Sequence, residues 1–168
     1  MRLIIQRVKD AELSVNGKNY SSISNGLVVF VGFEAEDGEK EIEFMVKKLI
    51  NLRIFPDENY KMNLSVSDIK GDLLLVSNFS LYADCTRGNR PNFMNALSGD
   101  KSIVLYDKFV NHTKNTFAGK VETGMFGEHM EIRQTTDGPI NITLDTKILM
   151  RWNLDENWKR CKKIKVKN

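Results

Sequence analysis

The sequence predicts an α+β domain in which about seven strands, paired mostly antiparallel, are combined with two main helices. Three observations support this class. Short runs of β-branched and aromatic residues recur along the chain, as they do in strands. Two longer segments repeat apolar residues every three or four positions, which is typical of amphipathic helices. Asn16–Gly17 is a hairpin signal, because both residue types tolerate a positive φ.

Three strands are expected before the first helix. Met1–Arg7 mixes apolar and polar residues in the manner of a buried strand, and Ala11–Val15 is predicted as a second, separate strand. Leu27–Phe33 is the strongest candidate, because β-branched and aromatic residues make up most of it. Asp37–Gly38 then ends the extended structure.

Two segments, Glu39–Asn51 and Ser102–Phe117, are predicted as helices. The first also has acidic residues early and lysines late, which is the order that the helix dipole favours. The apolar positions are Ile42, Met45, Val46, Leu49 and Ile50 in the first segment, and Val104, Leu105, Phe109 and Val110 in the second.

The remaining strands are short, and one of them precedes the first candidate site. Arg53–Phe55 resumes extended structure before Pro56, and the apolar run Leu73–Val76 predicts a buried strand. Three further strand-like pieces are bounded by glycines: Val121–Thr123, Met130–Thr135 and Ile140–Leu144.

A basic C-terminal extension, residues 147–168, is distinguished from the predicted domain, residues 1–146. The whole chain of 168 residues carries a net charge of only +3, yet seven basic and two acidic residues lie between Arg151 and Asn168. Two interpretations fit: the extension contacts nucleic acid phosphates, or it is a solvated terminus. Its apolar residues also suit a short docking helix: Ile148, Leu149, Trp152 and Trp158.

No cofactor, metal or membrane signature is present in the sequence. Cys85 and Cys161 fit no metal-ligand spacing, and without an export signal or a membrane-length apolar run we expect reduced thiols in a cytoplasmic protein. The two histidines, His112 and His129, stand in no known triad signature, and His112 is expected on a helix surface.

The first candidate site is the polar cluster Ser77–Asn78–Phe79–Ser80, which follows the buried strand. Arg87 and Arg90 come shortly after it in a loop. A strand that delivers hydroxyl groups next to a basic loop suits chemistry at the end of a polyanion. The alternative is a core strand that ends in an ordinary polar turn.

The second candidate site is Asp137–Gly138–Pro139, between two predicted strands. One interpretation is a simple turn. The other is a cis Gly–Pro bond, because X–Pro is the setting in which a cis peptide is accessible. Two successive carbonyl oxygens would then point in the same general direction and form a rigid acceptor surface beside a ligand.

Several motifs in the right order resemble the D-aminoacyl-tRNA deacylase family over nearly all of Met1 to Asp145. The first family signature, Ser-Gln-Phe-Thr-Leu, resembles Ser77–Leu81, and the second, Asn-x-Gly-Pro-x-Thr, contains Gly138–Pro139. The other matching segments are Met1–Val8, Leu52–Phe55, Lys61–Ser65, Phe126–Gly127 and Met130.

The resemblance implies a barrel-like sheet and an enzyme that hydrolyses the ester between a D-amino acid, or glycine mischarged on tRNA-Ala, and the terminal adenosine of tRNA. It implies a homodimer in which Gly138–Pro139 of one subunit enters the pocket of the other. In the family this bond is cis and its carbonyls exclude L-amino acids, while an arginine that corresponds to Arg7 orients it. Asp137, Ile140, Phe126 and Met130 are assigned to the same substrate-binding and selectivity region.

The resemblance also implies roles for the first cluster. The Phe79 N–H stabilises the developing oxyanion, Ser77 and Asn78 shape the adenosine end of the pocket, and Ser80 stands where a nucleophile was once proposed. No base is adjacent to Ser80 in the sequence, which favours assistance by the 2′-hydroxyl of the tRNA over an activated serine.

The chain departs from the family signatures at four positions: Asn78 for glutamine, Ser80 for threonine, Thr136 for asparagine and Asn141 for threonine. A related branch with a trans Gly–Pro bond accepts an L-amino acid and has threonine at the position of Thr136, although its motif differs after the proline. Two alternatives therefore stand beside the D-selective deacylase. One is a deacylase shifted toward L-aminoacyl-tRNA, and the other is a non-catalytic tRNA- or DNA-binding module.

Overall fold

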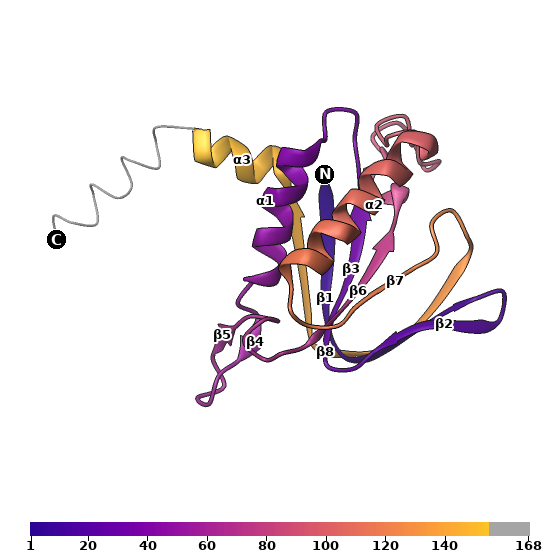
Figure 1. Cartoon of the computed structure of the whole chain (residues 1–168). Coiled ribbons are helices and arrows are strands. Elements are labelled where there is room, and N and C mark those ends of the chain that lie inside the picture. The colour runs from indigo at the N-terminus through magenta and orange to yellow at the C-terminus, as the bar shows by residue number, and fades with distance from the viewer. Residues whose placement is uncertain (155–168) are drawn as a thin grey trace, which may run out of the picture.

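A long N-terminal strand, β1, is central to the computed structural model, which describes residues 1–154 (Figure 1). In chain order the elements are β1 (Arg2–Val15), β2 (Lys18–Ile23), β3 (Gly26–Gly32), α1 (Glu39–Ile50), β4 (Phe55–Pro56), β5 (Met62–Leu64), β6 (Asp72–Ser77), the 3-10 helix η1 (Phe79–Tyr82), α2 (Gly99–Thr116), β7 (Val121–Thr123), β8 (Met130–Asp145) and α3 (Thr146–Leu154). The predicted α+β class is confirmed.

The main sheet is mixed rather than uniformly antiparallel. Its strands run in the order β2-β1-β3-β6-β7, and β8 pairs with β1. The pairs that include β1 are antiparallel, whereas β3–β6 and β6–β7 are parallel. The parallel pairs arise because helical crossovers, through α1 and α2, return the chain to the same end of the sheet. Within residues 1–154, four of the six strand pairs are antiparallel, as predicted, and the two parallel pairs join the three strands that lead to the site.

Two pairs of predicted strands are each one continuous strand. Residues 2–7 and 11–15 both belong to β1, which begins one residue after the predicted start, and residues 130–135 and 140–144 both belong to β8. The polar residues between them predicted breaks. Instead, β1 and β8 pair along most of their length, and register shifts opposite Arg7 and Lys9 absorb the irregularity.

The sheet has a hydrophobic core on each face. Helices α1 and α2 cover one face (Figure 1) and bury the larger cluster, which includes Leu27, Val29 and Leu75. The alternate residues Val28 and Leu74 belong to a second cluster inside the curl of the sheet. This curl brings β2 towards β7, where the Ser21 hydroxyl donates to the Thr123 carbonyl at 3.0 Å, so the predicted barrel-like shape is confirmed.

The predicted local signals are largely confirmed. Asn16 and Gly17 have φ values of 52° and 72° in the β1–β2 turn. Helix α1 buries the five predicted apolar residues and carries acidic residues in its first turn and lysines in its last. Helix α2 begins at Gly99, three residues before the predicted start. Within residues 1–154, no helix combines the length and the apolar character needed to cross a membrane.

A third helix, α3, follows β8 directly. The Thr146 N–H donates to the Met1 carbonyl at 3.0 Å, and Lys147 pairs with the buried Glu34, whose hydrogen bond raises the pKa of the lysine. A helix is therefore present where the extension was predicted to begin, although Trp158 lies outside the described residues. The division of the chain at residue 146 stays a prediction.

Candidate active site

The carboxyl ends of β3 and β6 and the segment that follows β7 meet at one pocket. Strand β6 is buried between β3 and β7 and ends at Ser77, whose side chain is half-buried. Crevices beyond the carboxyl ends of parallel strands are common ligand sites, because the connecting loops there are free to diverge. The predicted buried strand Leu73–Val76 is confirmed, and the polar residues after it lie at a cavity.

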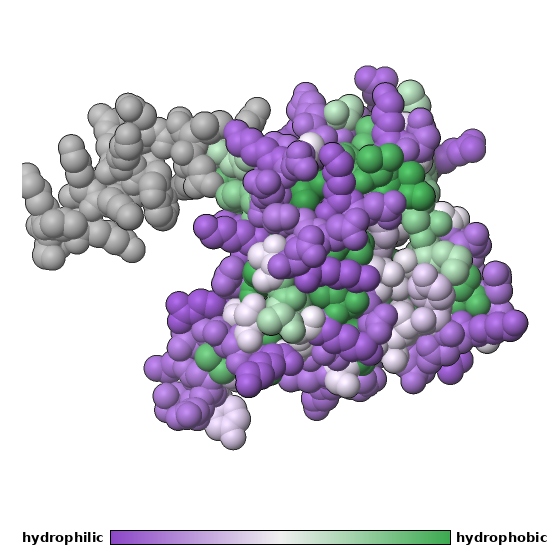
Figure 2. All heavy atoms as spheres, in the orientation of Figure 1, coloured by the Kyte–Doolittle hydropathy of each residue, from purple (hydrophilic) through white to green (hydrophobic). Residues whose placement is uncertain are grey.

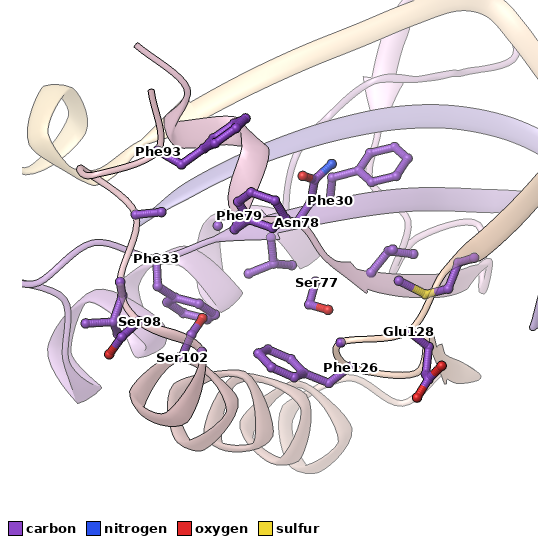
Figure 3. A pocket seen from close by; sticks show the side chains of 18 of the residues that line it. Phe30, Phe33, Ser77, Asn78, Phe79, Phe93, Ser98, Ser102, Phe126 and Glu128 are labelled. Atoms are coloured by element: carbon purple, nitrogen blue, oxygen red, sulfur yellow. The ribbon is translucent and has the colours of Figure 1, made fainter. Parts of the chain in front are cut away.

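The pocket has a volume of about 600 Å³ and is open to solvent (Figure 3). Phe126 and Ser102 lie on one side, Asn78 and Phe79 lie on the other, and Ser77 lies between them. A pocket of this size is in the range that takes a small ligand. Its wall combines aromatic rings with hydroxyl groups, which suits a ligand that has both a ring system and polar substituents.

The turn after β6 fixes the orientation of the first candidate cluster. The Asn78 N–H donates to the Val31 carbonyl at 2.8 Å, and the Asn78 Oδ1 accepts from the Ser80 N–H at 2.9 Å as the cap of η1. As the first residue of this helix, Phe79 has an N–H that the helix itself does not satisfy. The turn therefore presents a backbone donor beside the pocket.

Ser80 is placed differently from its neighbours. Its hydroxyl donates to the Asn78 Oδ1, and the residue is exposed and does not line the pocket. Among residues 1–154, no histidine contacts this hydroxyl. Of the four residues in this predicted cluster, Ser77, Asn78 and Phe79 line the pocket and Ser80 does not, and their catalytic roles stay a prediction.

The second candidate cluster forms an exposed bulge on the β1–β8 ladder. Gln6 pairs with Asn141 and Val8 pairs with Thr136, so residues 137–140 lie opposite Arg7 alone. The Gly138–Pro139 bond is cis, and both residues are exposed. At Gly138, where φ is +121°, an added Cβ would lie 2.8 Å from the Ile140 Cγ1, so the position requires glycine.

Arg7 ties this bulge to the body of the domain. Its guanidinium Nε lies 2.9 Å from the Asp137 Oδ2 and also donates to the Asp137 carbonyl at 3.2 Å, while its Nη1 donates to the Ile54 carbonyl at 2.6 Å. The side chain also lies over the Phe55 ring, with the guanidinium carbon 5.8 Å from the ring centroid. Arg7 is buried, and its contacts fix the direction of the segment that follows Asp137.

The chain therefore separates its predicted site residues into two groups. Five of them line the pocket: Ser77, Asn78, Phe79, Phe126 and Met130. The other six do not line it. Ser80 is one of them, and the remaining five form the bulge or, in the case of Arg7, hold it: Arg7, Asp137, Gly138, Pro139 and Ile140. A single chain does not bring the two groups into one cavity.

The pocket wall also contains residues that the sequence patterns did not predict. His129 lies on the pocket wall beside Met130, and Ser98 and Ser102 come from the start of α2. In the sequence, these residues could have been suspected because His129 precedes the predicted site residue Met130, and Ser98 and Ser102 lie at or near the predicted start of a helix. Tyr106 is buried next to this wall: its hydroxyl donates to the Leu75 carbonyl at 2.7 Å, burial raises its pKa, and its ring centroid lies 5.8 Å from that of Phe126.

The described residues offer no evident metal centre. Within residues 1–154, no three potential metal-ligating side chains are grouped together. The polar groups on the wall are hydroxyls, an amide, His129 and the carboxylate of Glu128. Such a wall can bind and orient a substrate and can stabilise a developing negative charge through backbone donors.

The fold and the pocket together define an α+β protein with a ligand-binding cavity at the carboxyl ends of parallel strands. The chain belongs to the D-Tyr-tRNA(Tyr) deacylase family, whose model matches residues 4–145. It is 49% identical over 147 residues to a D-aminoacyl-tRNA deacylase of Thermosipho africanus, a match that covers 88% of this chain and 98% of the relative. A D-aminoacyl-tRNA deacylase of Dictyoglomus turgidum is 48% identical, with 90% and 96% covered.

Solved structures share the fold. One described as c-Myc DNA Unwinding Element Binding Protein superposes with a TM-score of 0.83 at 35% identity, over 86% of this chain and 98% of that one. Another, described as a probable eukaryotic D-amino acid tRNA deacylase, has a TM-score of 0.74 at 20% identity and the same coverage, and it supports the fold alone. The resemblance predicted from the sequence motifs is confirmed at the level of the family.

Proposed function

We propose that this chain hydrolyses the ester that joins a D-amino acid to the terminal adenosine of tRNA, and so removes wrongly charged D-residues before they enter protein synthesis. The observation that carries the proposal is the match to relatives named D-aminoacyl-tRNA deacylase along 88% of the chain or more. Glycine mischarged on tRNA-Ala is a further proposed substrate, because it has no side chain that a chiral filter could reject.

The pocket is proposed to bind the terminal adenosine with the ester next to η1. Phe126 and Met130 then contact the substrate, and Ser77 and Asn78 shape the adenosine end. The Phe79 N–H stabilises the oxyanion that develops as the ester carbonyl is attacked. This group is unpaired within its helix, which leaves it available for that role.

Water, rather than Ser80, is the proposed nucleophile. The Ser80 hydroxyl is already donated to Asn78, and the residue lies off the pocket wall. An activated serine requires a base within hydrogen-bond reach, and the 2′-hydroxyl of the tRNA is instead proposed to assist the attack. Cofactor and metal are not part of this mechanism.

Selectivity for D-residues is proposed to come from a second copy of the chain. The bulge at Gly138–Pro139 is exposed, and β8 pairs only with β1 in residues 1–154, so this face is accessible to another subunit. In the proposed homodimer, the carbonyls of Gly138 and Pro139 enter the partner's pocket, supported by Asp137 and Ile140, and collide with the side chain of an L-amino acid. Both enantiomers carry the same groups, so discrimination needs such a repulsive element.

Mixed dimers test this arrangement. A pocket-blocked variant, Ser102→Phe, retains its bulge, whereas Gly138→Val retains its pocket. Mixed after denaturation and refolding together, the two should recover D-selective hydrolysis that neither shows alone. If the mixture shows no D-selective hydrolysis although light scattering detects dimers, the bulge does not enter the partner's pocket.

A second candidate function is the binding of nucleic acid without hydrolysis. It is favoured by one observation, the name of the structural neighbour described as a DNA unwinding element binding protein. The purified protein, given matched D- and L-aminoacyl-tRNA, separates the candidates. Hydrolysis of the D-ester supports the deacylase. Binding without hydrolysis of either ester supports the binding module, and faster hydrolysis of the L-ester supports the related L-selective branch.

A further inference from the structure

The loop between η1 and α2, residues 83–97, continues the wall of the pocket onto the surface. Phe93 and Leu97 from this loop line the pocket together with Phe79. The rings of Phe79 and Phe93 meet edge to face, with centroids 5.0 Å apart and an interplanar angle of 73°. Phe79 is 61% exposed and Phe93 is 38% exposed. An exposed aromatic pair at the mouth of a pocket offers a stacking surface to a planar ligand group.

Hydrogen bonds within the 83–97 loop hold it in one conformation. The Asp84 N–H donates to the Asn92 carbonyl at 2.7 Å, and the Asn92 N–H returns a bond to the Asp84 carbonyl at 2.9 Å. The side chains of the same residues accept from the N–H groups of Thr86 and Met94, each at 2.9 Å. The Leu97 N–H donates to the Phe33 carbonyl at 2.9 Å. Groups on this loop are therefore preorganised relative to the pocket.

The tip of the loop carries two cations that have no counter-ion in the described part of the chain. Arg87 and Arg90 are exposed, and neither forms an ion pair within residues 1–154. By contrast, nearby Arg2 is paired with Asp145, and Lys147 is paired with Glu34. Figure 2 shows hydrophobic and hydrophilic groups side by side over the upper right of the molecule, where this loop lies in Figure 1.

We propose that the 83–97 loop binds the single-stranded nucleotides that precede the terminal adenosine of the substrate tRNA. Arg87 and Arg90 bind their phosphates, and the Phe79–Phe93 pair stacks against a base. This inference rests on the proposed function, because the terminal adenosine must first occupy the pocket for the preceding nucleotides to cross the loop.

The chemistry of the loop favours a single strand over a duplex. Guanidinium groups bind phosphates in a bidentate manner, and aromatic side chains stack on unpaired bases, which is the combination typical of single-strand binding. Double-stranded RNA hides its base faces and is contacted through phosphates and 2′-hydroxyls. The exposed aromatic pair would have no ligand group to stack on in a duplex.

Binding of uncharged RNA tests the proposal independently of hydrolysis. The probes are a fluorescent RNA hairpin that ends in the single-stranded 3′ nucleotides of tRNA and the same hairpin with a blunt end. The variant is Arg87→Gln/Arg90→Gln, and the control Lys40→Gln/Lys47→Gln removes the same charge from exposed positions on α1. Titrations by fluorescence anisotropy are repeated between low and moderate salt.

We expect the wild type and the control to bind the overhang hairpin more tightly than the blunt one. The arginine variant should lose roughly tenfold or more in affinity for the overhang, and its log–log salt slope should fall by about 1.4, since each phosphate contact on a single strand contributes about 0.7. Phe93→Ala should weaken overhang binding with an unchanged slope. Unchanged overhang binding by the arginine variant, or equal losses on both hairpins, would overturn the proposal.

The binding titration, combined with an assay of D-aminoacyl-tRNA hydrolysis, distinguishes failure of the loop proposal from failure of the deacylase proposal. If the wild type binds the overhang through the loop yet hydrolyses no D-aminoacyl-tRNA, the deacylase proposal fails and the binding surface stands. If it hydrolyses the D-ester while the arginine variant keeps wild-type salt dependence, the loop proposal fails alone.

Discussion

The substitution Arg7→Lys tests whether Arg7 orients the Gly138–Pro139 bulge, because it leaves the bulge on the chain and removes part of its support. In the wild type the guanidinium contacts the Asp137 carboxylate at 2.9 Å and the Ile54 carbonyl at 2.6 Å. A lysine keeps the charge, but its single ammonium nitrogen replaces the planar guanidinium with its several N–H donors. It therefore cannot bind the Asp137 carboxylate and the Ile54 carbonyl in the same geometry. The bulge should therefore remain on the chain while its direction becomes less defined.

The magnitude follows from the contacts that are lost. A hydrogen bond to a charged group is worth roughly 1.5–3 kcal/mol, and about one such bond should disappear. The Asp137 side chain is 32% exposed, which weakens its share of the interaction. We expect the free energy of unfolding to fall by about 2 kcal/mol, and the ratio of D- to L-aminoacyl-tRNA hydrolysis to fall by roughly tenfold.

Urea denaturation and deacylation of matched D- and L-aminoacyl-tRNA measure the two effects. Arg53→Lys is the control, because that exposed arginine donates a single bond, at 2.7 Å, to the Asn63 carbonyl; its stability should change by less than about 0.5 kcal/mol. A folded Arg7→Lys protein with the wild-type D/L ratio would show that Arg7 does not orient the bulge for selectivity. So would equal losses of both activities, since these would indicate general damage to the pocket.

Three further predictions concern single side chains. Ser80→Ala should retain deacylation within a few-fold of wild type, because water is the proposed nucleophile; near-total loss with intact tRNA binding would contradict this. Gly138→Ala should destabilise the fold by about 1–3 kcal/mol in urea melts, because its Cβ would lie 3.0 Å from the Ile140 backbone nitrogen; wild-type stability would show that the bulge relaxes. Hydrogen bonds from the Ser65 N–H and hydroxyl lower the pKa of Asp68 below its usual 3.8, so this contact should stabilise the fold above about pH 4 and be lost as the pH falls through the lowered pKa. Asp68→Asn should therefore show a flatter stability profile below pH 4, and an unchanged acid limb would argue against the contact.

The sequence predicted the elements whose signals are local. The run Leu73–Val76 is buried on both faces, and Glu39–Asn51 repeats its apolar residues on one side, so strand and helix are evident without tertiary information. The continuity of β1 was not evident. Lys9 and Asp10 are exposed at a register shift, and only the pairing with β8 keeps the strand extended there.

The part of the candidate site at the end of one strand could be predicted from the sequence. The part that comes from distant loops could not be predicted to the same extent. Ser77 ends β6, Asn78 and Phe79 follow it directly, and all three line the pocket. His129 and Ser102 come from segments that meet the pocket only through tertiary packing. The departure of Ser80 from the wall also depends on geometry, because the η1 cap turns its hydroxyl towards Asn78.

Chiral proofreading by this chain is tested most simply by the initial rates at which the purified full chain hydrolyses D-Tyr-tRNA and L-Tyr-tRNA, measured side by side at equal concentrations. We expect rapid loss of the D-ester and hydrolysis of the L-ester close to the uncatalysed rate. Comparable rates on the two esters, or a faster rate on the L-ester, would contradict the claim that this chain proofreads the chirality of aminoacyl-tRNA.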